Sequence, residues 1–531
     1  MRSEERSNVK QIQGLLNHLD GSGRTPRDVQ ITALKWIEEN WDSGKHLVIS
    51  APTGAGKSML ARTLQIATGA PIIAPSNDLV RQYAASYPEL NKYIGQQHYR
   101  CEPHRMTCRA AQRLTNCDGS GCGGCPLRLS RERAMNGNTV FNPLSLWHLI
   151  RQQGYEYDTT IVDEAHSVLN MLRTLSSSSR RLTNEEFTAL RAKGFNPRRI
   201  DEWILVDFLL ERAQLLYERA KSATTLAAKT RFENRAMEFE HTANCLKAES
   251  EKYAIWFHGQ RMNIQAVKVP KNTIKKVLKG RCILLSATLV KSDINEILNN
   301  EPYEYLDLAS PIPVQNRKVY FSPSEFRHNY SELDPKELVK RVEDIIKGEG
   351  TPNTIVHVPY SLAEEMREYW TMPVITHNRD DKAAALRRFI SNGGVLIGSG
   401  CTEGLDLKGD LCRLNIIAKL QWPCLGDSWV KKRRAMQDGY MWYLAETLKV
   451  IIQAAGRSTR GEDDYSRCIV LDPSFSVLIA QCKKLGLVPQ YFLESIDWRL
   501  YEVNIPRLLS ISQELSKGGF ETGTNVRAVR A

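Results

Sequence analysis

The stretch HLVISAPTGAGKSML, residues 46–60, decides the fold. Its first five residues, His46–Ser50, are mostly apolar and predict a short buried strand. The glycines within residues 54–56 allow a turn in which backbone N–H groups approach an anion without a clash from a Cβ atom. An apolar-periodic helix is predicted from Lys57 onward, and its N-terminus adds partial positive charge. Strand, glycine-rich loop and helix in this order predict a P-loop for the phosphates of a nucleotide.

The side chains at the end of this loop have separate expected roles. Lys57 is expected to reach the β and γ phosphates of ATP, and the Ser58 hydroxyl is expected to hold Mg²⁺. Ala51 stands where the first glycine of such a motif usually lies. The residues expected to bind the nucleotide here are Thr53, Gly54, Ala55, Gly56, Lys57, Ser58 and Met59.

A second apolar strand is predicted in TTIVDEAH, residues 159–166, and it ends at Asp163. A carboxylate at the C-terminal end of a strand beside a P-loop is in the position of a Mg²⁺ ligand. Glu164 follows directly and is expected to orient or deprotonate the attacking water. The two segments together predict a nucleotide-hydrolysing site.

Composition narrows the class of protein. The chain has 531 residues, which is enough for two to four domains, and 72 basic against 60 acidic residues give a net charge of +12. The excess of positive charge favours a polyanionic partner. The N-terminal MRSEERSNVK has no apolar segment, and no run of 18 apolar residues occurs, so neither a signal peptide nor a membrane span is expected. We expect a cytoplasmic protein with reduced thiols, nucleoid-associated if it comes from a prokaryote or a phage.

Five of the twelve cysteines fall within residues 101–125. A disulfide framework is not expected for reduced thiols, so the spacing favours a metal site. Four thiolates suit either a structural zinc ion or an iron–sulfur cluster, and Cys-Gly-Gly-Cys suits both, so spacing leaves the metal open. The candidate ligands are Cys101, Cys108, Cys117, Cys122 and Cys125, of which four would suffice.

Several segments match the motifs of a known enzyme family. APTGAGKS, VDEAH and LLSATL (284–289) resemble motifs I, II and III of a superfamily 2 helicase. TIVHVPYS (354–361), GSGCTEGLDLKGD (398–410) and QAAGRSTR (453–460) resemble motifs IV, V and VI, and all six stand in the family's order. With the segment IIAKLQWPCLGDSWVKKRR and a cysteine insert between motifs I and II, the chain resembles the XPD/DinG group of iron–sulfur helicases.

The resemblance implies roles for further residues. Arg27 and Gln30 of RDVQ stand where such enzymes contact adenine, and motif V would add contacts to the nucleotide. Arg457 and Arg460 are three residues apart, so on a helical turn both would face the γ-phosphate from one side. The implied residues of motifs V and VI are Glu403, Gly404 and Asp406, and Gln453, Arg457 and Arg460.

The resemblance also implies a domain organisation. The expected fold class is α/β, with tandem RecA-like P-loop motor lobes and two inserts in the first lobe. A [4Fe–4S] insert is expected by its position between motifs I and II, with zinc as the alternative, and a helical Arch-like insert is expected further on. The predicted boundaries are lobe 1 at 1–100, 127–168 and 259–309, the cluster insert at 101–126, the Arch-like insert at 169–258, and lobe 2 at 310–531.

The implied function is an ATP-dependent DNA helicase that moves 5′→3′ on single-stranded DNA. Single-stranded and forked DNA are the expected partners, other repair or replication proteins are candidates, and the chain is expected to be a monomer. The alternatives are a translocase that remodels nucleoprotein with little unwinding, a helicase–nuclease and an RNA helicase. Expected strand contacts include Ser76, Asn77 and Arg81, and the basic run 431–434. The aromatic residues near this run could stack on bases, but core packing is favoured for any single one of them.

Overall fold

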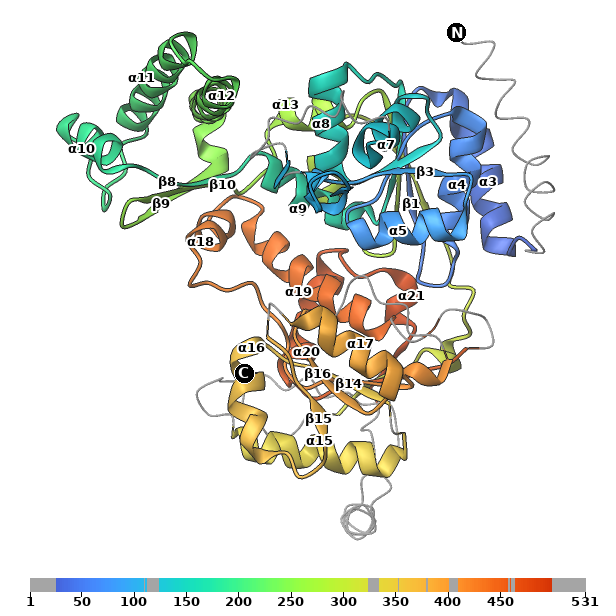
Figure 1. The fold of residues 1–531 in the computed structure, drawn as a ribbon. Helices are drawn as coiled ribbons and strands as arrows, with labels where there is room; N and C mark the ends of the chain where they lie inside the picture. Colours follow the sequence, from blue (N-terminus) through green and yellow to red (C-terminus); the bar gives the residue numbers. More distant parts are fainter. Residues whose placement is uncertain are drawn as a thin grey trace, which may run out of the picture. The chain divides into compact units, whose positions relative to one another are not determined.

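The computed structural model describes most of the chain, and its residues form two compact units. Unit 1 contains Met1–Pro311 and Trp422–Glu446, and unit 2 contains Ile312–Gln421 and Thr447–Ala531. The described residues are 25–108, 110–111, 124–322, 334–351, 353–378, 381–400, 409–456, 459 and 464–498. Figure 1 shows the course of the chain through both units.

Unit 1 is built on a seven-stranded parallel sheet with the order β12-β1-β11-β7-β2-β6-β3. Its strands are β1 (His46–Ser50), β2 (Ile72–Ile73), β3 (Asn91–Tyr93), β6 (Thr139–Phe141), β7 (Thr159–Asp163), β11 (Arg281–Ser286) and β12 (Tyr303–Asp307). Its helices are α3 (Asp28–Asn40), α4 (Lys57–Thr68), α5 (Asn77–Ser86), α7 (Pro126–Met135), α8 (Pro143–Gln153), α9 (Ala165–Leu175), α13 (Lys271–Val277) and α14 (Lys291–Ile297). A parallel sheet covered by helices is the α/β fold that the sequence predicts.

The strands of this sheet are apolar on both faces because helices cover both faces. Leu47 and Ile49 of β1 join one core cluster, whereas Val48 joins the cluster on the opposite face. The strand predicted over 46–50 and the strand predicted to end at Asp163 are both confirmed, and they flank β11. The carboxyl ends of β1 and β7 therefore meet at one edge of the sheet, where a site in such a fold is expected.

The insert of unit 1 contains a small sheet that the sequence did not predict. Its helices are α10 (Asn184–Ala192), α11 (Glu202–Lys221) and α12 (Leu226–Glu249), and Figure 1 shows α11 and α12 side by side. An antiparallel sheet adds β8 (Ser178–Arg181), β9 (Tyr253–His258) and β10 (Arg261–Ala266) in the order β8-β10-β9. The helical stripe Leu205, Leu209, Ala213 and Leu216 is buried as expected. The expected purely helical insert over 169–258 thus differs from the structure, which has strand at 178–181 and from 253 to 266.

Residues Trp422–Glu446 belong to unit 1, although the expected second lobe ran without interruption over 310–531. Helix α18 (Ser428–Arg434) packs against β9, and Lys432 Nζ donates hydrogen bonds to the carbonyl oxygens of Ser250 and Tyr253. These contacts hold the segment on the insert, which a boundary drawn from motif order does not reveal.

Unit 2 repeats the parallel architecture with a sheet of the order β15-β16-β14-β17-β18-β13-β19. Its strands are β13 (Val319–Phe321), β14 (Thr354–His357), β15 (Val374–Ile375), β16 (Val395–Gly398), β17 (Leu414–Ile417), β18 (Arg467–Val470) and β19 (Ile496–Asp497). Its helices are α15 (Pro335–Glu349), α16 (Tyr360–Glu365), α17 (Lys382–Asn392), α20 (Ser474–Lys484) and α21 (Gln490–Leu493), and it includes the last part of α19 (Gly439–Ala455). Within the described ranges, no helix is long and apolar enough to cross a membrane.

Candidate functional site

The P-loop lies between β1 and α4 at the carboxyl edge of the unit 1 sheet. Gly54 and Gly56 have φ angles of 85° and 79°, a backbone region that L side chains rarely adopt. Gly56 is the N-cap of α4, and its lack of a side chain leaves the first N–H groups of the helix without a side-chain cap. Uncapped N–H groups at the positive end of a helix dipole form a binding site for an anion.

Gln30 fixes the P-loop from the side of α3. Its Nε2 donates a hydrogen bond to the carbonyl oxygen of Gly56 at 3.2 Å, and its Oε1 accepts one from the Arg27 backbone at 2.8 Å. A Cβ atom on Gly56 would lie 2.1 Å from that Nε2, so another residue here would displace Gln30, besides being strained by the positive φ. The structure therefore brings the predicted Gln30 directly against the predicted loop.

The side chains of Lys57 and Glu164 face each other at the end of the P-loop. Lys57 Nζ is 3.5 Å from Glu164 Oε1 and donates a hydrogen bond to the Ala51 carbonyl at 3.4 Å. The Lys57 side chain is 10% exposed and that of Glu164 is 33% exposed. A cation and a carboxylate therefore face one small space at the end of the P-loop, with the carboxylate still reached by water.

Asp163 is buried, and its two carboxylate oxygens accept hydrogen bonds from different donors. Tyr83 donates to Oδ2 at 2.6 Å, and the Glu164 backbone N–H donates to Oδ1 at 2.8 Å. Burial raises the pKa of Asp163, the Glu164 charge raises it further, and Lys57 acts in the opposite direction. Burial also raises the pKa of Tyr83 well above its usual value, as does the nearby Asp163 charge, so the phenol remains a donor.

Glu164 sits in a strained backbone conformation with φ 47° and ψ 49°. A non-glycine residue in this left-handed region is costly and is often found where function requires it. His166 Nδ1 lies 3.4 Å from Glu164 Oε2 and 2.8 Å from Ser286 Oγ, and Ser286 Oγ accepts a hydrogen bond from Thr288 N at 3.2 Å. Polar contacts thus connect the end of β7 with the end of β11.

The structure brings together the predicted residues of unit 1. The P-loop residues 53–58, together with Gln30, Asp163 and Glu164, are all at or near the end of β1 and β7. The half-buried Met59 side chain packs against the core. Gln453 lies in α19 within the residues of unit 2. The predicted residues Glu403, Gly404, Asp406, Arg457 and Arg460 lie outside the described residues.

Sequence reasoning missed three residues of the site: Tyr83, His166 and Ser286. Tyr83 follows the apolar stripe of an amphipathic helix, so the pattern predicts core packing for it. His166 and Ser286 could have been predicted as site residues, because His166 lies in the motif VDEAH and Ser286 lies in the motif LLSATL.

The cysteine segment is described in part. Cys101 ends β4 (Arg100–Cys101), which pairs with β5 (Met106–Thr107), and Cys108 follows that hairpin. Cys101 and Cys108 are buried in the same core cluster against which the half-buried Cys125 packs. Across the described ranges, no three His, Cys, Asp or Glu side chains form a group that could hold a metal ion. Cys117 and Cys122 lie outside the described residues, so the three described thiols alone do not complete a ligand set.

Part of the basic run at 431–434 is engaged inside unit 1. Arg433 is buried and forms a bidentate ion pair with Asp438, with N–O distances of 2.7 and 2.9 Å. Lys432 binds backbone carbonyls of the insert, and Trp442 is buried beneath Arg433. The prediction of a strand contact is therefore wrong for the buried Arg433, whereas the core packing favoured for a single aromatic is confirmed for Trp442.

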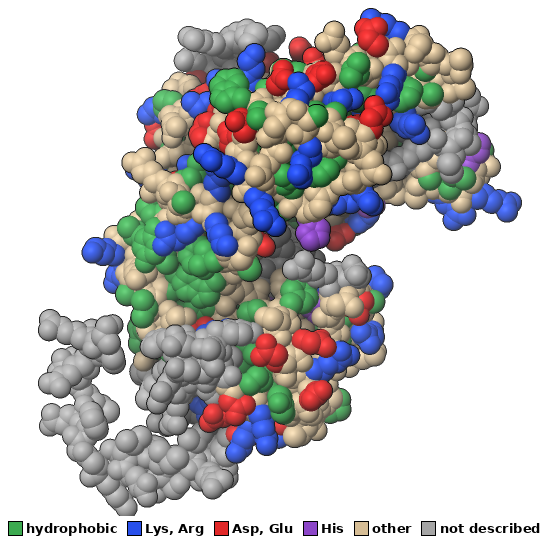
Figure 2. Space-filling view, turned by 90° about the vertical axis from the view of Figure 1, so that its left-hand side faces the viewer, with side chains coloured by type: hydrophobic (Ala, Val, Ile, Leu, Met, Phe, Trp, Pro, Cys, Tyr) green, Lys and Arg blue, Asp and Glu red, His purple; other side chains and the backbone are tan. Residues whose placement is uncertain are grey.

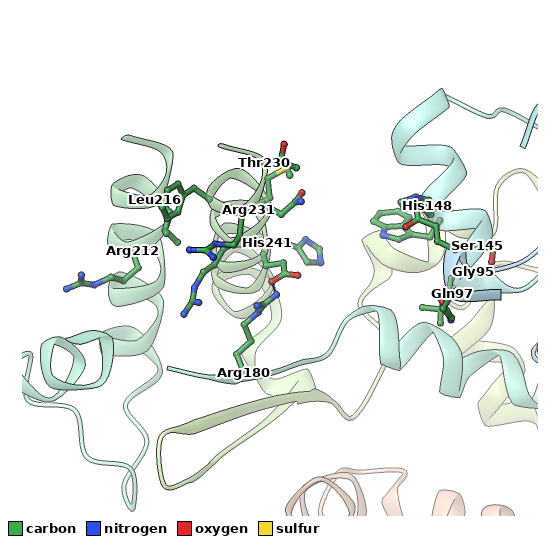
Figure 3. A pocket seen from close by; sticks show the side chains of 18 of the residues that line it. Gly95, Gln97, Ser145, His148, Arg180, Arg212, Leu216, Thr230, Arg231 and His241 are labelled. Carbon is green, nitrogen blue, oxygen red and sulfur yellow. Dashed lines mark hydrogen bonds and ion pairs between the residues drawn. The ribbon is translucent and has the colours of Figure 1, made fainter. Parts of the chain in front are cut away.

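A large pocket of about 2410 Å³ lies within unit 1, between the insert and the RecA-like sheet. Figure 3 shows arginines of the insert on one side and residues such as Ser145 and His148 on the other. The charged lining residues are five arginines and three glutamates, a net charge of +2: Arg180, Arg212, Arg219, Arg231, Arg235, Glu185, Glu186 and Glu238. Basic and acidic side chains both occur on the face drawn in Figure 2, so that face is mixed in charge.

Comparisons with known proteins agree with this architecture. Residues 350–483 match the model of the helicase C-terminal domain family. The chain is 24% identical to the ATP-dependent DNA helicase YoaA of Escherichia coli over 52% of this chain and 47% of that protein. It is 27% identical to the ATP-dependent DNA helicase DinG of Photobacterium profundum over 32% of this chain and 27% of that protein. The matches thus span about half or less of these relatives.

Two solved structures share the fold. A structure titled XPD helicase has a TM-score of 0.56 and 14% identity, covering 87% of this chain and 98% of that one. Xpd4 of S. tokodaii has a TM-score of 0.52 and 16% identity, covering 90% of this chain and all of that one. The chain therefore shares its fold with these XPD structures.

Proposed function

We propose that this protein is an ATP-dependent DNA helicase. The observation that carries the proposal is the convergence of an uncapped P-loop helix, Lys57, Asp163 and Glu164 at one edge of the unit 1 sheet. The curated relatives bear the names of ATP-dependent DNA helicases, which supports DNA as the substrate.

In the proposed reaction, the backbone of the P-loop and Lys57 bind the phosphates of ATP. Asp163 and the Ser58 hydroxyl have the oxygen donors that Mg²⁺ prefers, and the Tyr83 hydroxyl is hydrogen-bonded to Asp163 and to Ser58. Bound Mg²⁺ would neutralise charge on the β and γ phosphates. These contacts hold the γ-phosphate in place for attack.

Glu164 is the proposed base that orients the attacking water. Its carboxylate is partly exposed and is held between Lys57 and His166, which restricts its orientation. By their resemblance to motif VI, Arg457 and Arg460 of unit 2 are proposed to stabilise the transition state. Hydrolysis then couples the two lobes to movement along the strand, proposed as 5′→3′ from the resemblance alone.

The pocket of unit 1 is the proposed path of a single strand. Four of its five arginines pair with its three glutamates: Arg180 with Glu238, Arg235 with Glu186, and Arg212 and Arg219 with Glu185. Arg231 lies over the ring of Phe232. At the opposite wall, the buried Ser145 Oγ has no hydrogen-bond partner among the described residues, and it lines the pocket beside Asn77 and Asn142.

We further propose that the cysteine segment holds a [4Fe–4S] cluster, with zinc as the alternative. Support comes from five cysteines within 25 residues and from the shared core position of Cys101, Cys108 and Cys125. Iron content and absorbance near 400 nm test this proposal: a colourless protein that contains zinc would overturn the assignment of iron.

The function is tested by measuring ATP hydrolysis and strand separation on 5′-tailed DNA, 3′-tailed DNA and RNA with one preparation. We expect stimulated hydrolysis and unwinding on 5′-tailed DNA. Unwinding of RNA alone would reject DNA as the substrate. Hydrolysis without separation of any duplex would favour a translocase.

A further inference from the structure

Tyr83 joins the proposed metal ligand to a helix that is not part of the P-loop. Its hydroxyl donates to Asp163 Oδ2 at 2.6 Å, and both side chains are about 1% exposed. Tyr83 belongs to α5, whereas Asp163 ends β7, so the bond connects two elements that are 80 residues apart in sequence. Because both groups are buried, the phenol and the Glu164 N–H together determine how the carboxylate is turned.

The opposite end of α5 lines the pocket. Ser76 is the N-cap of the helix, with its side chain accepting a hydrogen bond from Leu79 N, and Asn77 is the first helical residue. Both line the pocket, where Asn77 accepts a hydrogen bond from Asn142. Tyr83 lies six positions after Asn77, which corresponds to about 9 Å along a helix. One rigid helix therefore reaches from the pocket wall to the Asp163 carboxylate.

We propose that Tyr83 is a positioning residue that couples occupancy of the pocket to the affinity of the nucleotide site for its divalent cation. A strand that engages Ser76 and Asn77 biases the position of α5, and the Tyr83 hydroxyl transmits that bias to the orientation of Asp163. The coupling between the pocket and the metal site rests on the proposed function, because it requires a nucleic acid strand in the pocket.

The expected size of the effect follows from what the hydroxyl does. A group that orients a metal ligand through a hydrogen bond, when removed, typically lowers metal affinity by about 10–100-fold. Tyr83→Phe keeps the ring in the core cluster and removes only the hydroxyl, with its donation to Asp163 and its bond to Ser58. Coupling is reciprocal, so a strand that tightens metal binding must itself bind more tightly when metal is present.

The test uses the full chain with ADP and Mn²⁺, whose free ion is measured by electron paramagnetic resonance, with and without a single-stranded DNA oligonucleotide. Tyr87→Phe is the matched control, because Tyr87 lies at the C-terminal end of the same helix with its ring 6.3 Å from that of Tyr83. Thermal unfolding of both variants shows whether each is folded. We expect Tyr83→Phe to bind Mn²⁺ about 10–100-fold more weakly than the wild type and Tyr87→Phe.

We also expect the oligonucleotide to raise the Mn²⁺ affinity of the wild type and of Tyr87→Phe, but not that of Tyr83→Phe. Equal Mn²⁺ affinity in the three proteins would overturn the positioning role. An equal oligonucleotide effect in all three would overturn the coupling. If the wild type does not bind the oligonucleotide, the proposed function fails and the coupling fails with it, whereas the titration without DNA still decides the positioning role.

Discussion

The two seven-stranded parallel sheets have the same architecture and different chemistry at the ends of their strands. In unit 1, β1 leads through a loop with two glycines of positive φ into α4, whose first N–H groups are open to an anion. In unit 2, β14 leads through Val358 and Pro359 into the short helix α16, without glycine and with proline as the N-cap. The P-loop chemistry therefore resides in the connection after the strand, and the sheet only positions it.

Under the proposed function, phosphate and metal binding belong to unit 1, and unit 2 contributes through the residues that resemble motif VI. Substitutions in each unit, each paired with a matched control residue, separate these contributions to ATP hydrolysis and strand binding. The expected effects fall from several orders of magnitude to less than one unit of a salt slope.

Arg460→Ala tests the contribution proposed for unit 2 and should have the largest effect. Arginines that stabilise the transition state of phosphoryl transfer contribute about 10³–10⁵ in rate. We expect hydrolysis to fall by that factor while ATP binding is retained, measured by steady-state turnover and by equilibrium binding of a fluorescent nucleotide. Arg467→Ala is the control, because Arg467 forms a surface ion pair with Glu349. Normal turnover in Arg460→Ala would remove the proposed role.

Glu164→Gln tests the base in unit 1. Loss of a positioned general base costs about 10²–10⁴ in rate, and glutamine keeps the size of the side chain. We expect slow hydrolysis with nucleotide affinity close to that of the wild type, measured by single-turnover kinetics. Glu304→Gln on β12 is the control, since Glu304 pairs at the surface with Lys45. Equal loss in both variants would point to general damage of the sheet.

Gly56→Ala separates the chemistry of the P-loop from backbone strain. Both Gly56 and Gly69 have positive φ, at opposite ends of α4, but only a Cβ at position 56 would meet another residue, Gln30. Each substitution should cost about 1–3 kcal/mol of stability from strain. Only Gly56→Ala should also weaken nucleotide binding, by about tenfold, the size of one lost charge-assisted hydrogen bond. Equal nucleotide affinity in Gly56→Ala and Gly69→Ala, measured by calorimetry, would contradict this account.

Arg231→Ala tests the pocket and should have the smallest effect. One phosphate contact contributes about 0.7 to the slope of log affinity against log salt for a single strand. We expect the slope for a single-stranded oligonucleotide to fall by about 0.7 in Arg231→Ala, measured by fluorescence anisotropy. The control is Arg191→Ala on α10 of the same insert, because Arg191 is exposed and does not line the pocket. An unchanged slope in Arg231→Ala would place the strand elsewhere.

The nucleotide site was predictable because its signals are local. The strand, the glycine turn and the helix of residues 46–60 are adjacent in sequence, and their order alone specifies the geometry. Gln30 was predicted from its place in the motif order, and its hydrogen bond to the Gly56 carbonyl confirms that it lies at the P-loop. Tyr83 could not be found in this way, since its contact with Asp163 depends on how α5 packs against the sheet.

The insert was predictable only in its helices. The burial of Leu205, Leu209, Ala213 and Leu216 follows from periodicity within one helix. The pairing of β8 with β10 joins segments that are about 80 residues apart, and the β8 sequence SSRR has none of the β-branched or aromatic residues that favour strands. The two-residue turn of Gly259 and Gln260 between β9 and β10 was a local hairpin signal that sequence reasoning did not use.

The central claim is that ATP chemistry at the P-loop of unit 1 drives strand separation. It is tested most directly by unwinding of a 5′-tailed duplex by Lys57→Ala protein, with Lys347→Ala as the control, because Lys347 is a surface lysine of unit 2 paired with Glu343. We predict that Lys57→Ala separates no duplex while Lys347→Ala unwinds like the wild type. Unwinding by Lys57→Ala at the rate of the wild type would contradict the account.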